Sequence, residues 1–373
     1  MNILFVCFGE LSIKGGAMRA VSMVRALAEA GHRIDIVAAD AELQEHPNIG
    51  IIEGGGTASA SRHRLRMAVL RATGRKSYDC LHGVDEAVVF LSRIARFRKT
   101  KLVYAASRCF TGTMGIAPSR LWNLLPGYFS RLEKRILLQA SMVLSSCPAL
   151  SSDLRGLAQE TRINQIEDIP AQSMFCGRIL GRSALLDRFK GKSSSVVVCS
   201  ILPGNRKELR KLLMATRKVI ESIPHASFFF KGSLVEEAEK MAANLDILGR
   251  CSFLLPEETE AFLSALDIAD AVLLVPQPGG RYLHQEVFTL LQAPAPLVAV
   301  QSPAYGKLLT DLNSIQVLPS SEAMAEGLLR AIQEPLFSLG IATEGQQLIA
   351  DNYSFSSFKH KVRMVYHGLL KKD

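Results

Sequence analysis

The sequence predicts an α/β fold made of two doubly wound, Rossmann-like domains, each a parallel sheet covered by helices. Apolar strand candidates alternate with amphipathic helix candidates along all 373 residues. A mixed segment, 165–192, interrupts the alternation with Pro170 and three glycines. The length suits two domains of ordinary size. We therefore expect one domain up to residue 180 and a second from residue 181.

The first half predicts an open sheet that begins with a strand, a glycine loop and a helix. The apolar strand 2–8 is followed by the loop 8–16, the helix 17–30 and the strand 33–39. The later strand candidates are 49–53, 79–82, 101–106 and 141–145, and the later helix candidates are 59–73, 85–97, 119–139 and 148–158. This alternation is typical of parallel strands joined by helical crossovers.

The second half repeats the pattern. Its strand candidates are 195–200, 227–230, 251–254, 271–275, 297–300 and 315–318. Its helix candidates are 207–222, 236–243, 258–266, 284–293, 303–311, 321–333 and 341–351. Pro224 is expected to stop the first of these helices. Ligands of such sheets bind at the carboxyl ends of the strands, so we expect two domains that face each other across a cleft.

The glycine pair Gly15-Gly16 lies between the first strand and the first helix. Glycine lets backbone N–H groups approach a phosphate closely, and a helix start adds a positive dipole. The loop is therefore a candidate anion-binding loop. The alternative is a tight turn from strand to helix that binds no anion. Two glycines alone do not distinguish an anion-binding loop from such a turn.

The composition indicates a globular protein of a reducing compartment. Hydrophobic residues make up 48% and charged residues 21%, and no apolar run is long enough to span a membrane. The first apolar run lacks the basic lead and cleavage site of a signal peptide. Seven scattered cysteines without a CxxC pair argue against disulfides and structural zinc. We expect a cytoplasmic protein without a metal or other cofactor.

The net charge of +9 is concentrated in the first half, where residues 1–177 hold 22 Lys and Arg against 15 Asp and Glu. Two basic clusters fall on helix candidates. They are Arg62, Arg64, Arg66, Arg71, Arg75 and Lys76, and Arg93, Arg96, Arg98, Lys99 and Lys101. A basic amphipathic helix can dock on an anionic membrane, and a solvated helix face is the alternative. Aromatic residues are sparse between these charges, so we expect no nucleic acid partner.

Several motifs, each weak alone, occur in a specific order. In the first half they are the stretch 14–19 (KGGAMR) with 27–32 (LAEAGH), and 78–82 (YDCLH). A third begins at 132–138 (LEKRILL) and continues to Ser146 and Leu150. In the second half they are 200–215, 230–232 (FKG), 252–256 (SFLLP), 269–276 (ADAVLLVP), 288–299 and the tail 353–370. Together these motifs resemble the retaining glycosyltransferases of family 4, over nearly the whole chain.

The resemblance implies the GT-B fold and the transfer of a sugar from a nucleotide diphosphate sugar to an acceptor hydroxyl, with retention and without a metal. It implies an acceptor-side domain, 1–180, to which a C-terminal helix, 353–373, crosses back. It also implies a donor-binding domain, 181–352. With the basic first domain, it suggests a glycan or lipid-linked acceptor and a peripheral position on the inner membrane face.

The resemblance also assigns site residues. The predicted diphosphate-binding residues are Gly15, Gly16, Arg206, Lys207 and Arg281, and the predicted donor sugar and nucleotide contacts are Gly232, Leu255, Gly279, Gly280, Tyr282 and Thr289. His82 and Glu286 are the predicted catalytic residues, and Lys14, Arg19, Asp85 and Ser107 are expected on the acceptor side. A core position is the alternative for His82, and a solvated pair is the alternative for Arg206 and Lys207.

The chain departs from the family pattern at several positions, among them Ile201 or Leu202 in place of a basic residue and a missing asparagine in 163–170. Thr289 replaces the glutamate that grips the ribose, Val84 replaces a second histidine, and Pro294 replaces a glycine. Glu286, nearly one helical turn before Thr289, is expected to compensate. Two alternatives remain, a relative that binds a nucleotide sugar or a partner without turnover, and a sugar-nucleotide 2-epimerase. The loop after the first strand has no GxGxxG, which disfavours a nicotinamide dehydrogenase.

Overall fold

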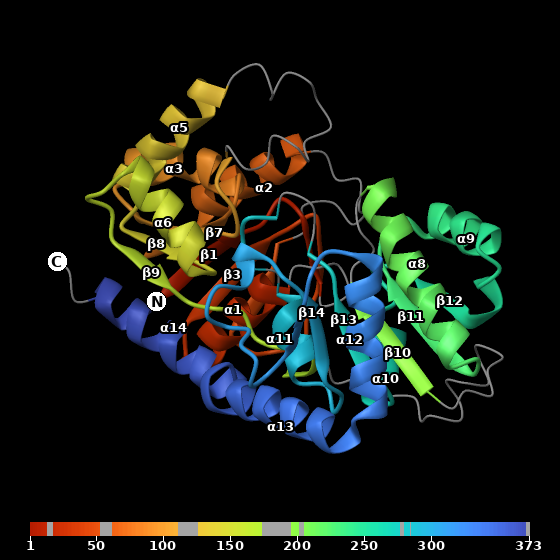
Figure 1. Cartoon of the computed structure of the whole chain (residues 1–373). Helices are drawn as coiled ribbons and strands as arrows, with labels where there is room; N and C mark the ends of the chain where they lie inside the picture. Colours follow the sequence, from red (N-terminus) through yellow and green to blue (C-terminus); the bar gives the residue numbers. More distant parts are fainter. Residues whose placement is uncertain are drawn as a thin grey trace. The chain divides into compact units, whose positions relative to one another are not determined.

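The computed structural model describes residues 1–12, 18–52, 62–110, 126–173, 195–200, 205–276, 280–283 and 285–370. The chain forms two compact units (Figure 1). Unit 1 comprises Met1–Asp168 and the C-terminal Phe355–Asp373, and unit 2 comprises Ile169–Ser354. The division falls at Asp168, earlier than the predicted boundary after residue 180. Each unit is built on one large parallel sheet, so the predicted pair of Rossmann-like domains is confirmed.

The sheet of unit 1 has seven parallel strands in the order β5-β3-β1-β6-β7-β8-β9. The strands are β1 (Asn2–Val6), β3 (Arg33–Val37), β5 (Ile49–Ile51), β6 (Cys80–Val84), β7 (Lys101–Ala106), β8 (Met142–Ser145) and β9 (Ile163–Gln165). The edge strand β9 and the short pair β2 (Glu10–Ser12) and β4 (Asp40–Glu42) were not predicted. These strands of three residues are too short to show a period.

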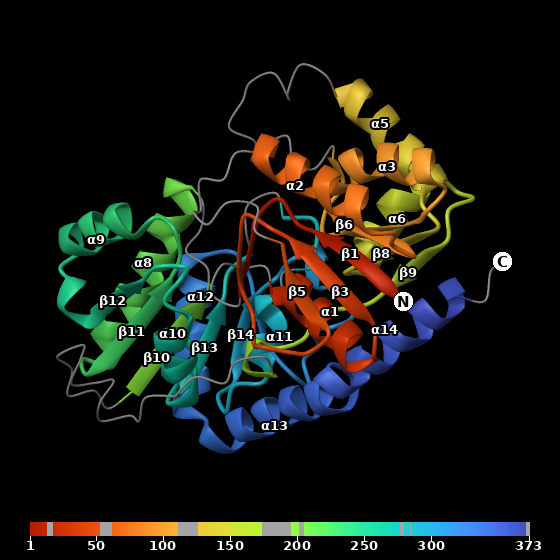
Figure 2. The same ribbon diagram turned by 180° about the vertical axis from the view of Figure 1, so that it is seen from behind.

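Helices cover both faces of this sheet (Figure 2). They are α1 (Met18–Glu29), α2 (Arg62–Arg75), α3 (Ala87–Arg98), α5 (Pro126–Gln139), α6 (Pro148–Leu157) and α14 (Phe355–Leu370). The C-terminal α14 packs on α1, and its Tyr366 stacks on His82 of β6, which stacks on Phe5 of β1. Lys359 of α14 also pairs with Glu29 at 2.9 Å. The last helix of the chain is thus part of the core of unit 1.

Gly83 of β6 allows α3 to pack tightly on the opposite face. A Cβ at Gly83 would lie 2.8 Å from the Val88 Cα and 2.9 Å from the Val88 nitrogen. Because both are backbone atoms, Gly83→Ala is expected to lower the free energy of unfolding by about 1–3 kcal/mol in urea denaturation. Gly74→Ala in α2, where nothing lies within 4 Å, is the matched control and should be neutral or slightly stabilising. Equal stability of the two variants would contradict the close approach.

The sheet of unit 2 has six parallel strands in the order β12-β11-β10-β13-β14-β15. The strands are β10 (Ser195–Ser200), β11 (Ala226–Lys231), β12 (Cys251–Leu254), β13 (Ala271–Leu274), β14 (Leu297–Val300) and β15 (Ile315–Val317). All six were predicted within about a residue or two. Their side chains alternate between two apolar layers, so Phe228 and Phe230 lie in one layer and Phe229 in the other.

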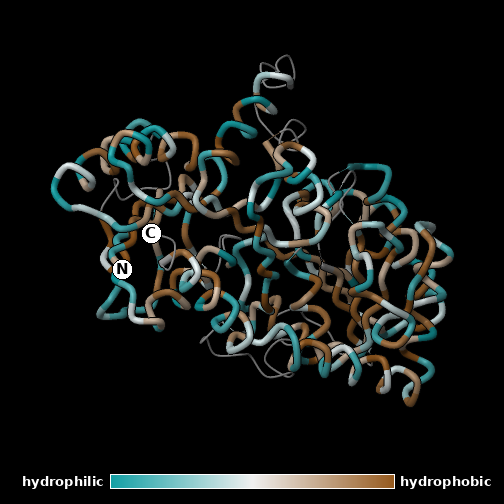
Figure 3. The backbone as a smooth tube through the Cα atoms, turned by 90° about the vertical axis from the view of Figure 1, so that its left-hand side faces the viewer, coloured by the Kyte–Doolittle hydropathy of each residue, from teal (hydrophilic) through white to brown (hydrophobic). Residues whose placement is uncertain are grey.

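The helices of unit 2 complete these two layers. They are α8 (Arg206–Ser222), α9 (Val235–Asn244), α10 (Thr259–Asp267), α11 (Glu286–Leu291), α12 (Ser321–Gln333) and α13 (Pro335–Asn352). Helices α8, α9 and α12 contribute to one apolar layer, and α10 and α11 to the other. Figure 3 shows the resulting alternation of hydrophobic and hydrophilic stretches along the chain.

The predicted helix 303–311 is wrong. A 3-10 turn, Pro303–Tyr305, stands there, and the Ser302 side chain accepts a hydrogen bond from the Ala304 nitrogen. Gly306 then adopts a φ of 54° and ends the turn. Tyr305 and Leu309, two of the apolar residues whose spacing suggested a helix, are buried in the core without forming one. In contrast, α13 is longer than the predicted 341–351 because Pro335 begins it.

Candidate functional site

Both sheets have a point at which the strand order reverses, and such points form ligand sites at the carboxyl ends of the strands. In unit 1 the reversal lies between β1 and β6, and in unit 2 between β10 and β13. The residues that follow these strands are therefore the first candidates for a functional site in each unit.

A lysine and a glutamate form the most enclosed ion pair near this edge of unit 2. Lys231 ends β11, and its Nζ lies 3.3 Å from Oε1 of Glu286, the first residue of α11. The two side chains are only 13% and 20% exposed. The Lys231 Nζ also lies 4.7 Å from the centre of the buried Phe262 ring of α10. Lys231 is thus held between two helices at the carboxyl end of its strand.

Lys231 was missed at the sequence level, because only Gly232 was assigned from its motif. The available signal was a charged residue at the end of the apolar run 226–230. A lysine is seldom buried unless it is paired, and the carboxyl end of a strand is where ligands of such sheets bind. Glu286, predicted as catalytic, lies beside it.

Arg206 and Lys207 form the start of α8, the helix that follows β10. The Asn205 side chain caps this helix by accepting from the Glu208 nitrogen at 2.9 Å. Both basic side chains are exposed, and the Arg206 Nε lies 3.3 Å from Glu237 of α9. The two predicted diphosphate-binding residues therefore stand at a helix N-terminus, a position that favours an anion.

The other donor residues predicted in unit 2 are described in part. The Gly232 nitrogen donates to the Leu254 carbonyl, and the Leu255 nitrogen donates to Glu258, so both backbone donors are used within the unit. The Leu255 side chain is 43% exposed. Gly280 and Arg281 are exposed and Tyr282 is half-buried, whereas Gly279 lies outside the described residues.

Thr289 is a structural residue. It is 2% exposed, and its Oγ1 accepts a hydrogen bond from the Ala171 nitrogen at 2.9 Å. The Gln172 side chain donates to the Thr289 carbonyl at 3.2 Å. The donor contact predicted for Thr289 is therefore replaced by a buried link between α11 and the first residues of unit 2. A glutamate would place a charge in this buried position.

Two predicted acceptor-side residues come together in unit 1. Asp85 follows β6 with a φ of 46°, and its carboxylate accepts from the Ser107 nitrogen at 2.9 Å and from the Ser107 Oγ at 2.5 Å. Burial raises the pKa of Asp85, and the Ser107 hydrogen bonds offset part of the rise. Glu86 next to it pairs with Arg62 at 2.9 Å. The carboxyl edge of this sheet thus carries a hydrogen-bonded carboxylate and hydroxyl.

His82 lies in the core and not at an open site. It is 0% exposed, and its Nδ1 is hydrogen-bonded to the Tyr366 hydroxyl. Burial and then the nearby charge of Arg19 lower the pKa of His82 to about 3, so its ring is neutral. The catalytic role predicted for His82 is therefore replaced by a core position, the alternative that the sequence left open.

Arg19 also has an internal role. Its Nη1 donates to the Ile166 carbonyl at 2.6 Å and to Asp168 at 2.7 Å, and the two charged side chains are 13% and 9% exposed. The pair joins α1 to the end of the first segment of unit 1, so the acceptor contact predicted for Arg19 is replaced by a structural ion pair. Lys14, Gly15 and Gly16 lie outside the described residues.

The first basic cluster is exposed on α2 and just after it, and several of its members have partners. Arg62 pairs with Glu86, and Lys76 lies 2.9 Å from Asp35. The Arg66 guanidinium lies 5.8 Å from the centre of the Phe90 ring. Within the described ranges, no helix is both long and apolar enough to cross a bilayer, and no group of three His, Cys, Asp or Glu could hold a metal ion.

Solved structures match the chain over its full length. Sucrose-phosphate synthase from Thermosynechococcus elongatus superposes with a TM-score of 0.74 at 13% identity and covers 100% of both chains. WaaG, a glycosyltransferase involved in lipopolysaccharide biosynthesis, has a TM-score of 0.71 at 14% identity and covers 97% of this chain and 99% of its own. The chain has the GT-B fold.

A third structure with the GT-B fold is Anabaena HepE, which was solved with UDP and glucose. Its TM-score is 0.70 at 14% identity, and the match covers 99% of this chain and 100% of HepE. No family model and no curated protein matches the sequence. At these identities the likeness concerns the fold, and the residues of this chain must carry any statement about its chemistry.

Proposed function

We propose that this protein transfers a sugar from a nucleotide diphosphate sugar to an acceptor hydroxyl, with retention at the anomeric carbon. The enclosed Lys231–Glu286 pair at the carboxyl edge of unit 2 is the observation that carries this proposal. The full-length likeness to glycosyltransferases supports it. In the reaction the bond from the anomeric carbon to the diphosphate oxygen breaks and a bond to the acceptor oxygen forms. The acceptor proton passes to the leaving diphosphate.

In this proposal unit 2 binds the donor. Lys231 and the exposed pair Arg206 and Lys207 counter the charge that develops on the departing diphosphate. Arg281 is proposed to add a forked contact to the phosphates, together with the backbone of Gly15 and Gly16. Glu286 orients Lys231 and accepts hydrogen bonds from the sugar hydroxyls.

Unit 1 is proposed to bind the acceptor. The Asp85 carboxylate, held by Ser107, would accept a hydrogen bond from the acceptor hydroxyl and orient its oxygen. The basic face of α2 suits an anionic glycan or a lipid-linked acceptor at the inner membrane surface. Arg62, Arg64, Arg66, Arg71, Arg75 and Lys76 are the proposed contacts.

The test is a donor screen with the purified full chain. UDP-, GDP- and ADP-sugars are added one at a time, and release of the nucleoside diphosphate and the shift in Tm are measured. Hydrolysis and stabilisation by one donor are expected, and NMR of the released sugar should show the anomer of the donor. Stabilisation without release would favour the non-catalytic relative, and conversion of the donor to its 2-epimer would favour the epimerase. The absence of any effect would overturn all three.

A further inference from the structure

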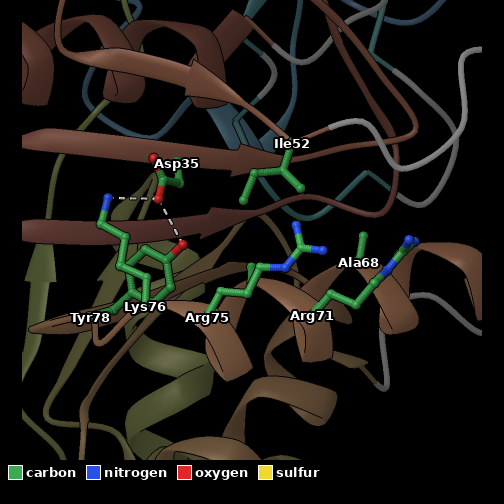
Figure 4. A pocket seen from close by; sticks show the side chains of 8 residues that line it. Asp35, Ile52, Ala68, Arg71, Arg75, Lys76 and Tyr78 are labelled. Carbon is green, nitrogen blue, oxygen red and sulfur yellow. Dashed lines mark hydrogen bonds and ion pairs between the residues drawn. The ribbon is translucent and has the colours of Figure 1, made fainter.

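A pocket of about 330 Å³ opens in unit 1 between α2, the edge strand β5 and its neighbour β3 (Figure 4). Ile52, Ala68 and Ala72 give it an apolar lining. Gly50 of β5 stands beside Asp35 of β3, and a Cβ there would lie 3.2 Å from the Asp35 Oδ1. The pocket is separate from Asp85 and Ser107, which follow β6 and β7.

The acidic group in this pocket is already neutralised. The Asp35 Oδ2 accepts from the Lys76 Nζ at 2.9 Å and from the Tyr78 hydroxyl at 2.7 Å. Burial and the hydrogen bond to Asp35 raise the pKa of Tyr78, so its hydroxyl keeps its proton and remains a donor. The three groups form a fixed wall at one end of the pocket, as the dashed lines in Figure 4 show.

Arg71 and Arg75 supply the positive charge that remains. They lie one turn apart on α2, line the pocket and are both exposed. Neither makes an ion pair with any residue that the structure describes, and α2 contains no acidic residue. In Figure 4 their side chains run side by side, with the Arg75 guanidinium near Ile52. Like charges one turn apart on a helix repel each other, and an anion bound between the two guanidinium groups would offset this repulsion.

We propose that this pocket binds a phosphomonoester, with Arg71 and Arg75 on the phosphate and the apolar lining against the adjoining carbon atoms. A guanidinium donates two parallel hydrogen bonds to phosphate oxygens, and two of them match a dianion. The phosphate belongs to a free metabolite or to a lipid headgroup. Arg71 and Arg75 are also among the proposed acceptor-side contacts, but binding of a phosphomonoester in this pocket does not require the transfer of a sugar.

The test compares the wild-type full chain with R71A/R75A and with R93A/R96A, which removes the same charge from exposed positions on α3 of the same unit. Calorimetry measures binding of inorganic phosphate and of glycerol phosphate, and flotation measures binding to phosphatidylcholine vesicles with and without phosphatidic acid. R71A/R75A should lose at least about tenfold in affinity, because each charge-assisted contact is worth more than a kcal/mol. R93A/R96A should stay within about twofold of wild type.

The vesicle and free-phosphate arms separate the two sources. Tight binding of glycerol phosphate identifies a soluble ligand, whereas binding only to phosphatidic acid vesicles identifies a headgroup. An equal loss in both double variants, or no binding in any arm, overturns the proposal. R71K/R75K keeps the charge without the forked donors and should bind at an intermediate level, which guards against misfolding of the alanine variant. These binding measurements contain no nucleotide sugar, so failure here is distinct from failure of the transferase, which the donor screen tests.

Discussion

Lys231→Ala is expected to reduce turnover of the donor, as kcat/KM, by about a hundredfold or more, the usual loss when one preorganised donor to a developing charge is removed. Lys231 is 13% exposed and is fixed by Glu286 and by the Phe262 ring, so no reorganisation is needed when the diphosphate leaves. Its low exposure also limits screening by salt. The measurement is the steady-state release of nucleoside diphosphate from the donor that the screen identifies.

The matched control is Lys240→Ala, which removes an exposed lysine from α9 of the same unit and should leave turnover unchanged. Glu286→Gln keeps the shape of the pair but removes its charge, so turnover should fall less than in Lys231→Ala. If Lys231→Ala and Lys240→Ala behave alike while both remain folded, Lys231 does not contact the donor. A loss of Tm without bound donor would instead indicate that the pair mainly joins β11 to α11.

The sequence predicts the sheets well because each central strand is buried on both faces and reads as a continuous apolar run. β10 and β13 are examples, and their bounds match closely. The short edge strand β9 lacks such a run, since all three of its residues are half-buried. The segment 303–311 has helical spacing, but Ser302 and Gly306 favour a turn. Local hydrogen bonding there outweighs the apolar period.

The candidate site was predicted less well, because motif positions do not show which way a side chain faces. His82 of β6 is the register partner of Phe5 in the neighbouring strand β1, and the two rings stack, so the His82 ring points into the core layer under α14. Thr289 lies on the buried side of α11, and Lys231 reaches toward that same helix. Asp85 and Ser107 came together as expected of residues that follow neighbouring strands. The meeting of these two residues after strand ends was thus predictable, whereas the inward orientation of His82 and Thr289 was not.

Glu133 of α5 is a buried carboxyl group that holds the segment after β7. It is 0% exposed, its Oε1 accepts from the Tyr104 hydroxyl at 3.0 Å, and its Oε2 accepts from the Phe110 nitrogen at 2.9 Å. Burial raises the pKa of Glu133 from 4.5 to about 7, although these two hydrogen bonds oppose the rise. The folded protein therefore keeps a proton that the unfolded chain has released between pH 4.5 and about 7.

Glu133→Gln should abolish one slope in the pH dependence of stability. In that window the folded state binds more protons, so rising pH destabilises the wild type by about 1.4 kcal/mol per pH unit, or about 3 kcal/mol in all. His82 acts in the opposite direction, because its lowered pKa costs stability as the pH falls below 6.5. Subtracting the free energy of unfolding of the wild type from that of Glu133→Gln at each pH cancels the contribution of His82 and leaves that of Glu133. Urea denaturation from pH 4 to 8 should show the variant gaining relative stability up to about pH 7 and then levelling off. Glu160→Gln, an exposed control in unit 1, should give a flat difference. A flat difference for Glu133→Gln as well would mean that Glu133 ionises freely in the folded protein.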